Sequence, residues 1–255
     1  MPQARVLPGL NEWQVWGLQL LVFPTDPATA LRQEWWNGLA MGPPEESRRK
    51  QFELVETGTY DGFNLTVSVD FQKIAWKVSA QLQADPFPYE LPTIGDYPAV
   101  RDRFVDMMSP WLAERCPPVQ RIGFAGALVL PTADHQAAYR QLDAYLATVQ
   151  VDPNSTDFTY RVNRPVPSDS DIVHLTVNRI GTWSAVKVNA AIRVAVPGGA
   201  IQPPAAESKL YGCMLEFDVN TSAEWPGPLP TGRRVDLLRE LARKATEMAQ
   251  QGDNP

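Results

Sequence analysis

The chain has 255 residues, of which 44% are apolar and 20% charged, as in an ordinary globular protein with a sizeable core. Its net charge of −6 argues against attraction of the whole molecule to nucleic acid or to an anionic membrane. Two cysteines without metal-ligand spacing, no signal-peptide pattern and no apolar run of about 20 residues predict a soluble, cytosolic protein with reduced thiols.

The first half of the chain predicts four strands and two helices. Asp26-Pro27 follows the first strand and supplies an N-cap and a first-turn proline for a helix that runs to residue 40. Gly42-Pro43-Pro44 ends this helix, and a charged loop over residues 45–50 follows. The expected strands cover residues 14–23, 51–57, 63–69 and 74–82, and the second helix covers residues 99–115 after a proline-rich loop over 85–98.

The strands over residues 63–69 and 74–82 predict a β-hairpin. Apolar and polar residues alternate along both segments, which is typical of half-buried strands. The short connection over residues 70–73 is of the length that joins two antiparallel strands.

The second half predicts the same order of elements after a joint at Cys116-Pro117-Pro118. Residues 172–179 and 183–196 are expected to form a second hairpin, followed by one additional strand and a final helix. The expected strands cover residues 119–130, 158–163, 172–179, 183–196 and 210–219, and the expected helices cover residues 133–149 and 233–250.

Sequence similarity between the halves predicts a tandem duplication. Residues 63–82 match residues 173–192 at seven of twenty positions without a gap, and Lys77 falls on Lys187. Chance similarity between strands is the alternative, but further matches in the same order favour duplication. The predicted fold class is α+β, a tandem β-α-β-β-β-α unit (residues 1–116 and 117–255) packed as one compact body. Its antiparallel sheets pack against helices with pseudo-two-fold symmetry.

Two resemblances accompany this prediction. The repeated order of elements resembles, in topology alone, the tandem repeats of TATA-binding-protein-like and other helix-grip folds. The Tyr160-Arg161-Val162-Asn163-Arg164-Pro165 segment and the Leu215-Glu216-Phe217-Asp218-Val219 strand resemble a sporadically distributed, uncharacterised bacterial family of about 250-residue proteins. This second resemblance implies an accessory protein from a mobile or antiviral-defence locus, and it brings no catalytic residues.

The motifs of enzymes are missing from the sequence. There is no GxSxG, Walker loop, GxGxxG or HExxH, and neither His135 nor His174 has a second ligand at metal spacing. Cys116, before two prolines, and Cys213, in an apolar strand, are interpreted as structural. We therefore predict no catalytic residues, no cofactor and no metal.

The polar face of the two predicted hairpins is the candidate partner-binding surface. A solvated face is the simplest interpretation, and a protein partner is the favoured functional one. Nucleic acid bound by the same face is the second alternative, and a small-molecule grip lined by Trp76 and Trp111 is the third. Adjacent Trp35 and Trp36 would point about 100° apart on a helix, which leaves a homodimer open. The predicted partner-binding residues are Lys77, Lys187, Asn64, His174, Asn178, Asn189, Arg193, Arg161 and Arg164.

Overall fold

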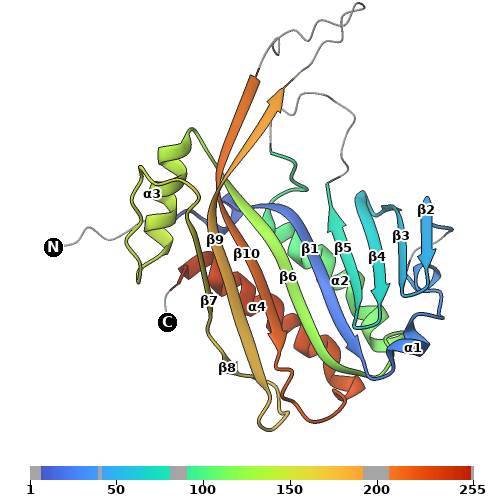
Figure 1. The fold of residues 1–255 in the computed structure, drawn as a ribbon. Helices are drawn as coiled ribbons and strands as arrows, with labels where there is room; N and C mark the ends of the chain where they lie inside the picture. The colour runs from blue at the N-terminus through green and yellow to red at the C-terminus, as the bar shows by residue number, and fades with distance from the viewer. Residues whose placement is uncertain (1–6, 40–41, 81–90, 192–206, 254–255) are drawn as a thin grey trace, which may run out of the picture.

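The computed structural model describes residues 7–39, 42–80, 91–191 and 207–253, and it confirms a mixed fold of helices and antiparallel strands. A single ten-stranded sheet runs in the order β2-β3-β4-β5-β1-β6-β10-β9-β7, and β8 pairs with β9 outside this path (Figure 1). The strands are β1 (Gln14–Pro24), β2 (Glu46–Lys50), β3 (Glu53–Tyr60), β4 (Phe63–Asp70), β5 (Ile74–Ser79), β6 (Val119–Thr132), β7 (Thr159–Asn163), β8 (Val166–Pro167), β9 (Thr176–Ala191) and β10 (Glu207–Thr221). The α-helices are α1 (Pro27–Ala30), α2 (Tyr97–Glu114), α3 (His135–Tyr145) and α4 (Arg234–Gln251).

The two halves of the chain meet in the middle of this sheet. β1 and β6 are antiparallel neighbours, with the other strands of the first half on the far side of β1 and those of the second half on the far side of β6. The sheet is therefore continuous across the joint between the halves. Pairing of the two halves leaves open either one continuous curved sheet or two sheets facing each other, and the ladder of hydrogen bonds between β1 and β6 shows the continuous sheet.

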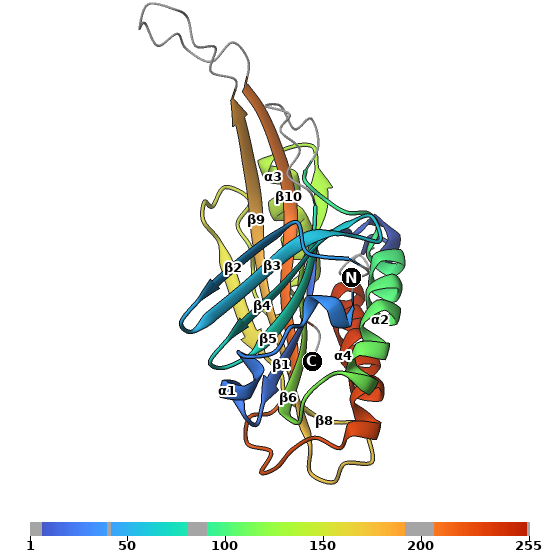
Figure 2. The ribbon, with the colours of Figure 1, turned by 90° about the vertical axis from the view of Figure 1, so that its right-hand side faces the viewer.

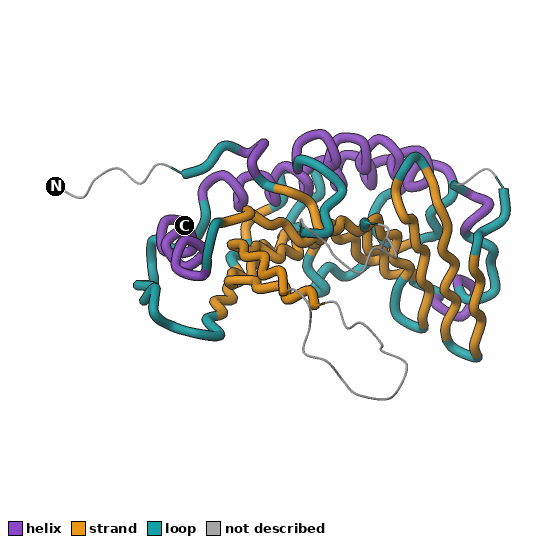
Figure 3. The backbone as a smooth tube through the Cα atoms, turned by 90° about the horizontal axis from the view of Figure 1, so that it is seen from above, coloured by secondary structure: helices purple, strands orange, loops and turns teal. Residues whose placement is uncertain are grey.

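The long helices α2 and α4 lie side by side on one face of the sheet, as Figures 2 and 3 show from two directions. The core lies between them and the sheet, where Trp76 of β5 packs against Trp111 of α2 with ring centroids 5.6 Å apart. The helix α3 adds Tyr145, which stacks on Trp183 at 5.1 Å. In the described part of the chain no long helix covers the opposite face, which we call the open face. No described helix has the length and apolar character needed to cross a membrane.

The predicted helix over residues 26–40 is wrong beyond its first turn. Asp26 caps it as expected, accepting a hydrogen bond from the Thr29 backbone, but α1 ends at Ala30. Trp35 and Trp36 lie in and beside a short 3-10 turn, each 3% exposed, and their indole N–H groups donate to the carbonyls of Ala30 and Gly42. Both tryptophans are buried in one molecule because the chain leaves helical geometry, so neither of them marks a dimer contact.

The charged segment expected to be a loop is the edge strand β2. All five of its residues are exposed, and Arg48 and Lys50 form ion pairs with Glu53 at 3.2 and 3.6 Å. Charged side chains on an edge strand oppose pairing with another chain, which fits the position of β2 at the end of the sheet.

The first predicted hairpin is confirmed as β4 and β5, but the second hairpin is wrong. In the first, the Asp70 carboxylate accepts hydrogen bonds from the backbone N–H groups of Gln72 and Lys73 at 2.7 and 3.0 Å. The aligned position in the second half carries Ile180, Gly181 and Thr182, which stay in register with β10. The single strand β9 therefore replaces the expected turn because no side chain there satisfies the backbone of a turn.

An Asp70→Ala variant is expected to lose about 1 kcal/mol of unfolding free energy, because two backbone donors lose their acceptor. Chemical denaturation would measure this loss, with Asp70→Asn retaining an acceptor oxygen as the matched control. An Asp70→Ala variant as stable as the unmodified protein would show that the carboxylate does not hold the turn.

Candidate functional site

The open face is hollowed along the middle of the sheet by a depression of about 310 Å³, which we call the β6 trough. Its floor is the small-residue segment Ala125-Gly126-Ala127 of β6, and its walls come from the strands on either side. The lining residues are Trp16, Gly17, Leu18, Gln19, Leu21, Lys77, Ala125, Gly126, Ala127, Glu216, Phe217 and Asp218.

Strand register explains why these residues lie together. Gln19 of β1 pairs with Lys77 of β5 on one side and with Ala125 of β6 on the other, and Ala125 pairs with Asp218 of β10. Residues paired across neighbouring strands project from the same face, at a strand spacing of about 4.8 Å. The short Ala125 side chain therefore leaves a gap between the longer side chains of β1 and β10.

Lys77 forms one wall of the trough. Its side chain is exposed and crosses above Gly17, and its Cε lies 3.5 Å from the position that a Cβ on Gly17 would occupy. The missing side chain at position 17 thus lets the lysine stem lie across β1 toward the trough. Within the described part of the chain, Lys77 has no ion-pair partner.

Two carboxylates form the opposite wall. Glu216 is exposed, and Asp218 is half-buried at the end of a chain of side-chain amides. Asn163 donates to Asn178 at 3.0 Å, Asn178 donates to the fully buried Asn220 at 3.1 Å, and Asn220 donates to Asp218 at 2.8 Å. This chain spans β7, β9 and β10 and fixes the orientation of the Asp218 carboxylate.

Four of the nine predicted partner-binding residues lie on the open face. Asn64 donates to Ser79 at 3.5 Å on β4 and β5, next to Lys77. Asn178 belongs to the amide chain, and Arg161 of β7 pairs with Thr182 on the same face. Their role in binding stays a prediction, but their placement on one face is as expected.

The other predicted residues do not join them. Lys187 lies nine positions after open-face Asn178 on the unbroken strand β9, and because side chains alternate along a strand it projects from the opposite face. Arg164 is bound to Asp253, and His174 lies exposed in a turn at φ 65°. The Asn189 side chain and Arg193 lie outside the described residues. The expected symmetric pair of lysines is therefore wrong, because it depended on a second hairpin.

The floor and the acidic wall of the trough were missed at the sequence level. Glu216 and Asp218 were noted only within a family resemblance. A signal was present in β6, where Gly123, Ala125 and Ala127 alternate on one face. Small residues in the interior of a strand often mark the close approach of another backbone or a ligand.

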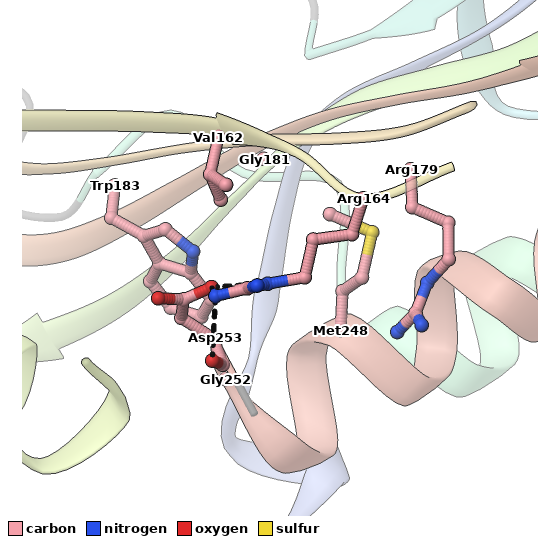
Figure 4. A pocket seen from close by; sticks show the side chains of 8 residues that line it. All are labelled: Val162, Arg164, Arg179, Gly181, Trp183, Met248, Gly252 and Asp253. Carbon is pink, nitrogen blue, oxygen red and sulfur yellow. Dashed lines mark hydrogen bonds and ion pairs between the residues drawn. The ribbon is translucent and has the colours of Figure 1, made fainter. Parts of the chain in front are cut away.

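A second hollow lies where the edge of the sheet meets the end of α4 (Figure 4). Arg164 reaches across it to the Asp253 carboxylate, with Nη2 at 2.6 Å and Nε at 2.8 Å. Its volume of about 20 Å³ has room for about one water molecule and no larger ligand. This cavity is structural.

A third hollow, the groove between α2 and α4, is bordered by arginines that already have partners. Arg101 contacts Asp102 at 2.7 Å and Thr246 at 2.9 Å, and Arg243 pairs with Glu247 and Asp169. The small-molecule alternative is not supported by Trp76 and Trp111. Their rings are 0% and 1% exposed and touch edge to face, so they fill the space that a ligand would need.

The described residues contain no group of three or more His, Cys, Asp or Glu side chains placed to hold a metal ion. No protein-family model matches this chain. Comparison with curated proteins and with solved structures found no match either.

Both thiols are expected to resist alkylation in the folded protein. Burial raises the pKa of Cys116 to about 12, although Arg234 partly offsets it, and burial raises the pKa of Cys213 well above its usual range. Because the thiolate is the reactive form, labelling by iodoacetamide at neutral pH should be at least about 100-fold slower than after unfolding. Rapid labelling of either residue in the folded chain would contradict the structural role.

Proposed function

We propose that this chain is a non-catalytic interaction protein that buries the open face of its sheet against a protein partner. The observation that carries the proposal is the β6 trough, where Lys77 and the pair Glu216 and Asp218 face each other across small residues. Opposite charges that line a hollow without meeting suit a partner that supplies the complementary charges. Half-exposed Leu21 and Ile180 on the same face add apolar area.

A protein partner is favoured over nucleic acid because two carboxylates stand on the trough wall and the net charge is −6. The accessory role in a bacterial assembly, implied by the family resemblance, belongs to this proposal.

We include the tandem duplication in this proposal. The strands of the two halves are matched by their order in the sheet. β1 with β6 and β5 with β10 occupy equivalent places on either side of the centre of the sheet. β4 then corresponds to β9, β3 to β7, and α2 to α4. Under this correspondence Lys77 on β5 is equivalent to a residue on β10, and not to Lys187.

An Ala125→Arg variant tests the proposed face. The long side chain would occupy the trough from its floor, and the tagged variant should lose the stoichiometric partner that co-purifies with the unmodified protein from its host. Lys187→Glu, a charge reversal on the opposite face, is the matched control and should retain that partner.

Retention of the partner by a folded Ala125→Arg variant would refute the open face as the docking surface. Salt-sensitive retention of DNA or RNA that is lost on Lys77→Glu would favour the nucleic-acid alternative instead.

A further inference from the structure

We infer that the partner of the open face is a second copy of this chain, related by a two-fold axis that runs along the strands between β1 and β6. The inference rests on the proposed function, since it names the partner of the same face. It follows from how side chains are distributed on β5, β1, β6 and β10, the four strands that line the trough.

The symmetry operation determines which strands would face each other. The axis lies midway across the four strands, so stacking two open faces about it places β5 of one copy over β10 of the other. It likewise places β1 over β6. Residues in one row of the sheet then oppose residues in the same row of the other copy. A two-fold interface uses the same patch twice, so that patch must be complementary to itself.

The charged row meets this condition. Lys77, Gln19, Ala125 and Asp218 form one continuous row across the four strands. The axis brings Lys77 of each copy over Asp218 of the other, and this pairing occurs twice. In the next row, Ser79 pairs with Gly17, Gly17 with Ala127, and Ala127 with Glu216. The Ser79 hydroxyl would therefore face the Glu216 carboxylate.

The sizes of the central side chains also make the patch complementary to itself. On β1 the open face carries Gln19 and Leu21, whereas the paired positions of β6 carry Ala125 and Gly123. The axis places each larger side chain of β1 over a smaller one of β6 in the other copy. Stacked sheets lie about 10 Å apart with interdigitated side chains, which requires such an alternation of large and small residues. The hollow in one copy is thus filled by the other.

Charge exchange between copies is the decisive test, because each variant alone repels itself. Lys77→Glu places a second carboxylate over Asp218 of the other copy, and Asp218→Lys places a second ammonium group over Lys77; each repulsion occurs twice per dimer. Sedimentation equilibrium should show a dimer for the unmodified chain and, for each variant alone, a dimer dissociation constant raised at least about 100-fold. An equimolar mixture of the two variants should form a heterodimer, because one copy then carries Lys77→Glu and the other carries Asp218→Lys. In that heterodimer neither contact joins two like charges.

The heterodimer has two different charge contacts between the copies. One contact joins the unmodified Lys77 of the Asp218→Lys copy to the unmodified Asp218 of the Lys77→Glu copy. The other joins the introduced glutamate to the introduced lysine. Both contacts therefore join opposite charges.

Two further variants keep the test decisive. Lys187→Glu, on the opposite face, should dimerise like the unmodified chain. Asp218 accepts a hydrogen bond from Asn220, so a charge change there can disturb folding. Ser79→Glu leaves Asp218 unchanged and places a carboxylate over exposed Glu216 of the other copy, so it should also raise the dimer dissociation constant. Thermal unfolding of every variant confirms that a folded protein is compared.

A monomeric unmodified chain, or a folded mixture that fails to associate, would overturn the inference. The proposed function has a separate outcome. If the unmodified chain is monomeric while Ala125→Arg still abolishes capture of a foreign protein, the open face docks that protein, and only the second copy is excluded as its partner.

Discussion

A Gly252→Ala variant is expected to lose roughly 3 kcal/mol or more of unfolding free energy, the largest effect predicted for a single methyl group in this chain. Gly252 ends α4 with φ 68° and ψ −143°, a conformation that favours glycine. A Cβ at this position would lie 2.1 Å from the Tyr145 carbonyl oxygen and 2.9 Å from its carbonyl carbon. That carbonyl accepts the Asp253 backbone N–H at 3.0 Å, so relief of the clash would break this contact.

Thermal unfolding would measure the effect as a fall in Tm of roughly 6 to 12 °C for a chain of this size. Gly227→Ala is the matched control, because a Cβ there meets nothing within 4 Å and should leave Tm almost unchanged. Equal Tm values for the two variants would show that the end of α4 is free to move away from Tyr145.

Asp253→Asn is expected to cost roughly 2 to 4 kcal/mol, because it removes the negative charge from a buried ion pair and weakens several hydrogen bonds at once. The Asp253 side chain is 0% exposed and accepts hydrogen bonds from Thr148, from Tyr160 at 2.8 Å and from Arg164 at 2.6 Å. These donors come from the segment after α3, from β7 and from the residue that follows β7. Asp253 thereby ties the end of α4 to the edge of the sheet.

The loss on Asp253→Asn should also depend on pH. Burial alone would raise the pKa of Asp253, but hydrogen bonds from Thr148, Arg164 and Tyr160 outweigh it and hold the pKa below its ordinary value. A carboxylate with a lowered pKa in the folded state stabilises the protein at pH values above its unfolded pKa of about 3.9. That contribution disappears as the pH falls through the folded pKa.

The stability difference between Asp253→Asn and the unmodified chain should therefore be constant near neutral pH and shrink below about pH 4. Urea denaturation across this range measures it, with Asp236→Asn on the exposed face of α4 as the control. A difference that persists unchanged into strong acid would show that the charge on Asp253 is not what stabilises the contact.

Local pattern was enough to predict much of the sheet. Alternating apolar residues predicted β4 and β5, and the apolar face of the last segment predicted α4. Side-chain alternation also placed Asn64 and Lys77 on the same face correctly. These predictions succeeded because each depends on residues that are neighbours in the sequence.

Predictions that depended on distant contacts failed. Trp35 and Trp36 were expected on a helix, but their burial against distant parts of the chain outweighed helical propensity. Residues 176–191 form one strand because β10 pairs along their whole length, and no local signal reports that partner. The sequence match of Lys77 with Lys187 aligned β5 with β9, and these two strands occupy different places in the sheet.

The order of residues was sufficient for the positions of most strands and helices, because these follow from local periodicity. The pairing of β1 with β6 came from the three-dimensional fold, and with it the row that joins Lys77 to Asp218, two residues 141 positions apart. Register across four strands depends on contacts between segments far apart in the chain. For that reason the candidate docking surface emerged from the fold and could not be found by reading residues in order.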